Sequence, residues 1–274
     1  MIKELDKTVF GRCKGLLNNK RQIEALAVIE GTNPGRVFVD DLTIPTSGMI
    51  WLGNNDGFFL IGNEENREFN NVLNHFIDDV IIPEAKKVGL DCFEGIGIHE
   101  RWNKTIEHVF KGRKLESWMQ KAYTLHANGN LNIREPVIDK RYETVRINQS
   151  FFENCSSMKN IEFLNSKILE SWSSISDFLN KGIGYCILYD NEIVSVCFSG
   201  FVAENIHSIY IETLVAHQGR KLAQKVARLF IQDCLEKNIL PYWECMEENK
   251  ASITIAESIG FKNTYNYKGY AFPF

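Results

Sequence analysis

The last third of the chain most constrains its fold, because five well-marked segments follow one another there. They read as strand, helix, strand, helix and strand: Ser208–Val215, Arg220–Lys237, Pro241–Met246, Lys250–Ser258 and Asn263–Phe272. Asn249 is a natural N-cap for the second helix, and Gly260 is a natural stop for it. A regular alternation of strands and helices predicts an α/β fold with a mixed sheet.

The residues before this unit extend the same domain. Thr144–Asn148 alternates as a strand, and Ile161–Leu179 has helical spacing. Gly184–Tyr189 and Ile193–Val202 read as a hairpin around a polar turn. We therefore predict a C-terminal domain over residues 144–274.

The first half of the chain reads as a separate α/β domain over residues 1–130. It combines short strand-like runs with amphipathic helices, and Asn54–Gly57 is a strong hairpin signal between two of those runs. Residues 131–143 are polar and contain Pro136, which is typical of a linker. This first domain contains no catalytic motif that we recognise.

Charge and cysteine usage narrow the class of protein. The net charge of -4 argues against a nucleic-acid partner, which would favour a basic excess. The seven cysteines are scattered without a paired motif, which fits a reducing compartment and small apolar side chains in a core. Neither a signal peptide nor an apolar run of membrane-spanning length is visible. We expect a soluble, cytoplasmic protein without a membrane partner.

The junction Thr213–Ala223 carries the clearest chemical signal. A strand leads into a short polar turn that opens directly into the helix we predict from Arg220. The first N–H groups of a helix have no intrahelical partners and carry the positive end of its dipole, so a pyrophosphate can dock there. Gly219 removes a Cβ from the approach, and Arg220 and Lys221 add two cations. Such a turn is also common in proteins without any phosphate site.

The turn and the later helix together resemble the GNAT superfamily of N-acetyltransferases in order and spacing. In that family the turn has the pattern Q/R-x-x-G-x-G/A and cradles the CoA pyrophosphate, and an N-x-x-S/A…G-F helix borders the pantetheine. Here Gln218–Ala223 matches the turn, and Asn249, Ser252, Gly260 and Phe261 match the helix. The flanking runs Pro34–Asp40 and Ile239–Cys245 look like the bacterial branch that includes zwittermicin A resistance-type proteins.

The resemblance implies a GNAT fold for residues 144–274, with a degenerate GNAT-like fold as one interpretation of the N-terminal domain. It implies acetyl-CoA as co-substrate and no metal. Leu214 and Val215 would present N–H groups to the acyl carbonyl and pantetheine. The other CoA-binding residues that it implies are Gln218, Gly219, Arg220, Lys221, Leu222, Ala223, Asn249 and Ser252.

The sequence departs from the family pattern at two positions. Lys221 stands where the family usually has a glycine. If the residue is already helical, its Cβ leaves the N–H groups free to donate and its ammonium can contact phosphate; the alternative is that the side chain crowds the loop and weakens CoA binding. Ala256 stands where a tyrosine often serves as the general acid. We select Tyr267 as the replacement proton donor. Other hydroxyl groups and water remain alternatives: Tyr265, Tyr270 and Ser252.

A general base must lie near the acceptor amine. Glu212 lies on the strand before the turn, where related enzymes often use a glutamate, and Glu244 on the next strand is an alternative. We expect His217 to be a solvent-exposed residue beside the phosphates, and Cys245 to fill the core. The histidines form no metal-binding pattern.

These patterns predict an N-acetyltransferase that moves an acetyl group from acetyl-CoA directly to an amine. By analogy with the branch, the acceptor is a small molecule such as an aminated natural product or antibiotic, and the N-terminal domain walls its cleft. A homodimer is compatible with the sequence. The main alternative is a non-catalytic CoA-binding or sensing protein. A protein-interaction module and a nucleotide-binding protein rank lower, and the GxxxxGK[ST] and GxGxxG patterns of nucleotide-binding proteins are missing.

Overall fold

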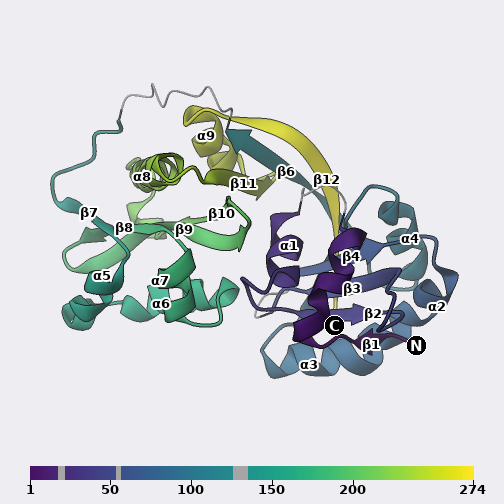
Figure 1. The fold of residues 1–274 in the computed structure, drawn as a ribbon. Helices are drawn as coiled ribbons and strands as arrows, with labels where there is room; N and C mark the ends of the chain where they lie inside the picture. The colour runs from purple at the N-terminus through teal and green to yellow at the C-terminus, as the bar shows by residue number, and fades with distance from the viewer. Residues whose placement is uncertain (18–21, 54–56, 126–134) are drawn as a thin grey trace. The chain divides into compact units, whose positions relative to one another are not determined.

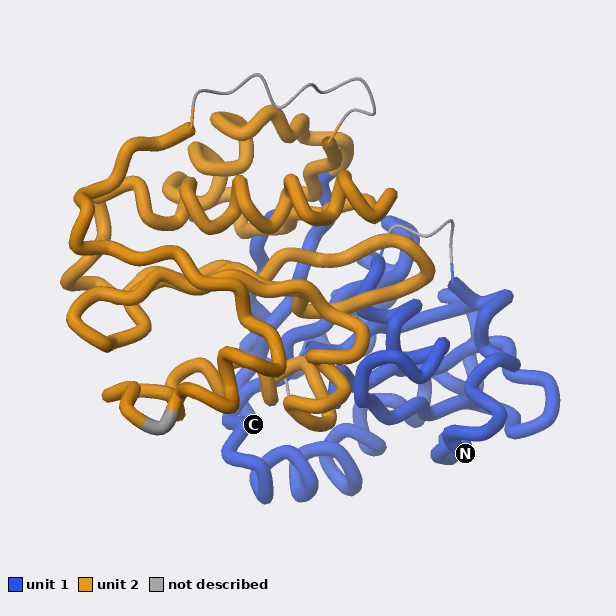
Figure 2. The backbone as a smooth tube through the Cα atoms, turned by 60° about the vertical axis from the view of Figure 1, so that its left-hand side comes forward, with its two compact units in different colours: residues 1–120, 266–274 blue, residues 121–265 orange. Residues whose placement is uncertain are grey.

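The computed structural model of this protein describes residues 1–17, 22–53, 57–125 and 135–274. The chain divides into two compact units (Figure 2). Unit 1 comprises Met1–Gln120 and Asn266–Phe274, and unit 2 comprises Lys121–Tyr265. The predicted hairpin turn at residues 54–56 and the first part of the predicted linker, residues 131–134, lie outside the described residues.

Unit 1 is a mixed sheet with helices. Its strands lie in the order β1-β2-β3-β4-β5-β12, and β4 and β5 are the parallel pair. Three phenyl rings from adjacent strands, Phe58, Phe93 and Phe272, stack in its core with centroids 4.7 Å apart at each step. The elements are β1 (Lys3–Glu4), η1 (Lys7–Leu16), α1 (Ile23–Ile29), β2 (Arg36–Val39), β3 (Ser47–Trp51), β4 (Gly57–Gly62), α2 (Arg67–Phe76), η2 (Ile77–Ile81), α3 (Ile82–Lys87), β5 (Cys92–Gly97) and α4 (Trp102–Val109).

Unit 2 is also a mixed sheet with helices. Its strand order is β12-β6-β11-β10-β9-β8-β7, and β10 and β11 are parallel. Strands β6 (Glu116–Leu125) and β12 (Phe261–Pro273) contribute residues to both units. The remaining elements are β7 (Tyr142–Arg146), α5 (Gln149–Glu153), η3 (Cys155–Ser157), α6 (Ile161–Ser171), α7 (Ile175–Lys181), β8 (Gly184–Tyr189), β9 (Glu192–Ala203), β10 (Ile206–Thr213), η4 (Val215–His217), α8 (Leu222–Glu236), β11 (Leu240–Met246) and α9 (Lys250–Ser258).

Helices cover both faces of the unit 2 sheet (Figure 1). One face packs against α8 through Leu222, Val226 and Phe230, whose spacing places them on a single stripe of the helix. The other face packs against α6 and α7 through Leu164 and Phe178. Strand β9 lies between these layers and is buried from its second residue onward, which explains its nearly continuous apolar sequence.

The division into units differs from the predicted domain boundaries. Unit 2 begins before the predicted linker, and Asn266–Phe274, which we assigned to the C-terminal domain, belongs to unit 1. The cause is the pairing of β12 with β5, in which Tyr270 lies opposite Gly95 and Phe272 lies opposite Phe93. A strand pattern in sequence does not say which sheet the strand will join.

The two units repeat one order of elements. In each, a first strand is followed by helices, three consecutive antiparallel strands, a helical segment, a strand parallel to the third of those three, a helix and a final strand. The predicted mixed α/β architecture is therefore confirmed. In the part of the chain that the structure describes, no helix combines the length and apolar character needed to cross a bilayer.

Candidate functional site

The turn between β10 and α8 adopts a backbone that differs from our prediction. Helix α8 begins at Leu222, so Arg220 and Lys221 precede it. Gly219 has φ of +74° and Lys221 has φ of +63°, both in the left-handed region. Our expectation that Lys221 would already be helical is wrong, since it is the left-handed N-cap residue. The positive φ gives a physical reason for the glycine that the family pattern has there.

A cleft of about 610 Å³ lies between this turn and α9. Its lining contains seven of the predicted CoA-binding residues: Gln218, Gly219, Lys221, Leu222, Ala223, Asn249 and Ser252. It also contains residues that the sequence reasoning did not assign to CoA: Ile211, Glu212, Thr213, His217, Gln224, Lys250, Ala251, Thr254 and Ile255. Arg220, Leu214 and Val215 are outside that lining. The two sequence motifs thus form opposite walls of one cavity.

The α9 wall is held by two hydrogen bonds at its start. The Asn249 side chain caps the helix by accepting from the Ser252 N–H at 3.0 Å. The Ser252 hydroxyl accepts from the Trp243 indole at 2.9 Å. Burial raises the pKa of the Cys245 thiol, and a hydrogen bond from Ser252 opposes that effect. Ala256 is fully buried in the core of unit 2.

The sheet opens beside the cleft. The parallel ladder between β10 and β11 pairs Ser208 with Tyr242 as its last register pair, although the described strands continue to Thr213 and Met246. Successive strand residues direct their N–H groups to opposite edges. The Leu214 N–H points toward β9, where it donates to the Val194 carbonyl at 2.9 Å.

Because N–H directions alternate along β10, the backbone groups that can meet a ligand differ from those that we predicted. The Leu214 N–H is already paired within the sheet, so it does not suit the role that we predicted for it. The Val215 side chain is 85% exposed. By the same alternation, the N–H groups of Ile211 and Thr213 point away from β9, and both residues line the cleft. The strand edge at Ile211 and Thr213 is therefore the part of β10 that can pair with a ligand.

Two tyrosine–glutamate pairs share one face of these strands, and Glu212 also contributes to the lining of the cleft. The Tyr210 hydroxyl donates to Glu212 at 2.5 Å, and the Tyr242 hydroxyl donates to Glu244. Residues two apart in a strand share a face, and the parallel register places both pairs on the same face of the sheet. Lys167 of α6 lies 3.6 Å from Glu212. The predicted base candidates thus lie on one face, on neighbouring strands.

The tyrosines selected as proton donors lie in different places. Tyr267 belongs to unit 1 and is 8% exposed, and it is absent from the lining of the described cleft. Tyr270 is buried in unit 1 and donates to Glu107 at 2.8 Å. Tyr265 lies in unit 2, with its hydroxyl 2.5 Å from that of Tyr242. Ser252 is the predicted hydroxyl that lines the cleft.

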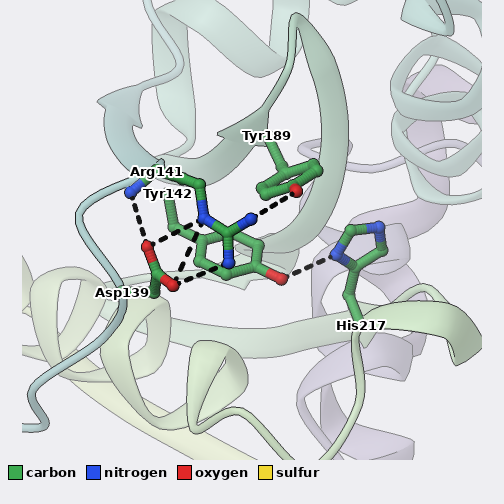
Figure 3. A network of polar contacts seen from close by, with 5 residues as sticks. All are labelled: Asp139, Arg141, Tyr142, Tyr189 and His217. Carbon is green, nitrogen blue, oxygen red and sulfur yellow. Dashed lines mark hydrogen bonds and ion pairs between the residues drawn. The ribbon is translucent and has the colours of Figure 1, made fainter.

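His217 is held in a polar network instead of being solvent-exposed as we expected (Figure 3). Its Nδ1 lies 3.0 Å from the Tyr142 hydroxyl. The Tyr142 ring packs at a tilt of 37° against that of Tyr189, whose hydroxyl accepts from Arg141 at 3.1 Å. The network joins β7, the end of β8 and the turn before α8. Among the described residues, no group of three or more His, Cys, Asp or Glu side chains is arranged to hold a metal ion.

Sequence comparisons relate the chain to acetyltransferases. The GNAT acetyltransferase family model matches residues 14–270. The uncharacterized N-acetyltransferase YdfB of Bacillus subtilis strain 168 is 26% identical over 275 residues, with 98% of each chain covered.

Solved structures show the same fold. A GCN5-related N-acetyltransferase-like protein from Streptococcus suis 89/1591 has a TM-score of 0.70 at 19% identity, covering 97% of this chain and all of its own. A tandem GNAT protein from the clavulanic acid biosynthesis pathway has a TM-score of 0.61 at 9% identity, covering 100% of this chain and 98% of its own. The predicted GNAT fold is thereby confirmed, and the likeness to a tandem protein agrees with the repeated order of elements.

Proposed function

The chain belongs to the GNAT acetyltransferase family, and we propose that unit 2 transfers an acetyl group from acetyl-CoA to the amine of a small molecule. The observation that carries this proposal is the single cleft formed by both sequence motifs. A 15-residue helix begins at its rim, so unpaired N–H groups and the positive end of a dipole face it. The open space at Gly219 leaves room for a pyrophosphate.

We assign one group of the chain to each chemical step. The N–H groups of Ile211 and Thr213 would pair with pantetheine and polarise the thioester carbonyl. Glu212 would take a proton from the amine, whose lone pair then attacks that carbonyl carbon. As the C–S bond breaks, the nitrogen gives up its second proton to water, and the CoA thiolate takes a proton from water or from Ser252, which regains one from water. Glu244 is the alternative base, because it lies on the same face of the next strand.

The acceptor class follows from the family resemblance. The resemblance to the zwittermicin A resistance branch supports a small aminated natural product or antibiotic. We also propose that acetyl-CoA is the donor, that the protein is cytoplasmic and that it forms a homodimer. The competing function is CoA binding without turnover, which the buried Ala256 at the usual tyrosine position favours.

Isothermal titration of acetyl-CoA into wild type, Gly219→Trp and Gly219→Ala tests the CoA site. Apart from its chain neighbours, no atom of the described residues lies within 4 Å of a Cβ built at Gly219, so an indole would project into open space. The alanine variant carries the same left-handed backbone strain without the bulk. We expect micromolar binding to wild type, a loss of at least about ten-fold in Gly219→Trp, and a much smaller loss in Gly219→Ala.

The outcomes separate the candidate functions. No binding to wild type would sink the acetyltransferase proposal. Binding that Gly219→Trp abolishes, followed by turnover on a panel of amines, would support it. Binding without turnover on any amine of the panel would favour the non-catalytic alternative.

A further inference from the structure

The contact between Tyr142 and His217 crosses from the first strand of unit 2 to the turn before α8 (Figure 3). Tyr142 is 6% exposed, so its ring is fixed by the core, whereas His217 lines the cleft. The hydroxyl meets Nδ1, which leaves Nε2 on the opposite edge of the imidazole ring (Figure 3). Nε2 is therefore the ring nitrogen that can meet a ligand.

We propose that Tyr142 is a positioning residue that fixes His217 with an Nε2–H group, which then donates to a phosphate of CoA. The inference rests on the proposed function. A neutral imidazole carries one N–H, and a phenol can donate or accept. When Tyr142 donates to Nδ1, the ring proton is on Nε2, where a phosphate oxygen needs a donor. The reverse arrangement would turn the lone pair of Nε2 toward an anion.

The surroundings keep the two side chains in this arrangement. The ring of Tyr189 lies 4.8 Å from that of Tyr142 and 5.2 Å from that of His217, measured between centroids. Arg141 donates to the Tyr189 hydroxyl and is itself held by Asp139. Hydrogen bonds from Arg141 lower the pKa of Asp139 to about 2, so this carboxylate stays charged at neutral pH. The ring of Tyr189, which a phenylalanine would also supply, therefore braces Tyr142 and His217 before any ligand arrives.

The two neighbouring tyrosines supply a matched pair of variants. Tyr142→Phe and Tyr189→Phe each remove one phenol hydroxyl from the same cluster, but the Tyr142 hydroxyl is the one that contacts His217. We expect Tyr142→Phe to weaken CoA binding by roughly five-fold in isothermal titration, which is the usual effect of one hydrogen bond. Tyr189→Phe should change CoA binding by less than about two-fold. With an acceptor in hand, KM for acetyl-CoA should rise in Tyr142→Phe while kcat stays nearly constant.

A spectroscopic readout separates positioning from general damage to the fold. Nitrogen-15 chemical shifts of His217, assigned with His217→Ala, should show the Nε2–H tautomer in wild type and in Tyr189→Phe. Tyr142→Phe should show a mixture of both tautomers. The same tautomer and the same CoA affinity in Tyr142→Phe and wild type would overturn the inference. Equal losses in both phenylalanine variants would also overturn it. Absence of CoA binding in wild type would instead sink the proposed function.

Discussion

At the scale of the residue, the turn before α8 is defined by two residues with positive φ, Gly219 and Lys221. Lys221 occupies a left-handed conformation that costs an L-residue roughly 1–2 kcal/mol. The cation that it supplies at the rim of the cleft offers a functional reason for tolerating that strain. Gly219, two residues earlier, also has a positive φ and presents open space to the cleft.

A comparison of Lys221→Gly with Lys221→Ala isolates the strain, because both variants lose the same ammonium. We expect Lys221→Gly to be more stable than Lys221→Ala by about 0.5–1 kcal/mol in urea unfolding. The left-handed penalty of alanine exceeds the extra unfolded-state entropy of glycine. Both variants should lose CoA affinity by the same small factor. Equal unfolding free energies for the two would contradict the left-handed conformation at Lys221.

At the scale of the element, β10 and β11 separate charges between their two sides. The side with the α8 turn carries Lys221 and Arg220 at or beside the rim of the cleft. The opposite face carries the side chains of Glu244 and of Glu212, which also contributes to the cleft lining, and each accepts a hydrogen bond from a tyrosine two residues before it. Lys167 is paired with both Glu170 and Glu212, so acids exceed bases among these side chains. This distribution suits an anionic donor on one side and a cationic acceptor on the other.

Three amines with the same four-carbon chain test that distribution: butane-1,4-diamine, butylamine and 4-aminobutanoate. We expect kcat/KM to fall in that order, with about ten-fold or more between the first and the last. The second ammonium of the diamine is attracted by Glu212 and Glu244, whereas the carboxylate of 4-aminobutanoate is repelled by them. Glu244→Gln should reduce the preference for the diamine. Glu236→Gln, at the C-terminal end of α8, is the matched control and should keep it. A preference for 4-aminobutanoate would refute a cationic acceptor.

Helices whose ends and buried faces are encoded by nearby residues could be predicted from the sequence. Asn249 caps α9 through its side chain as expected, and Leu222, Val226 and Phe230, at helical spacing, form the buried stripe of α8. The backbone of Lys221 could not be read in this way, because a side chain that usually avoids positive φ stands there. Nor could the sequence show that the Leu214 N–H would be paired with Val194, since this depends on register.

At the scale of the whole molecule, the two units share an order of elements but differ where CoA would bind. In unit 1 the β4–β5 ladder continues to the pair Leu60 and Gly97, and the Ile98 N–H donates to the Leu60 carbonyl at 2.9 Å. The turn before α2 contains Glu64, which is 6% exposed and lies 3.0 Å from Arg101. Unit 1 therefore keeps its strands paired where those of unit 2 open, and it places a carboxylate where unit 2 has cations.

These differences predict one CoA site per chain. A phosphate at the start of α2 would meet Glu64 and Glu65, and pantetheine would have to break backbone hydrogen bonds between β4 and β5. Titration of acetyl-CoA should therefore saturate at one molecule per chain. In Gly219→Trp, no further binding should be detected even at millimolar acetyl-CoA. Glu64→Gln, which removes one carboxylate from the turn of unit 1, should not create such a class, because the ladder stays closed. A stoichiometry of two, or residual binding that persists in Gly219→Trp, would show that the closed ladder of unit 1 opens to admit the ligand.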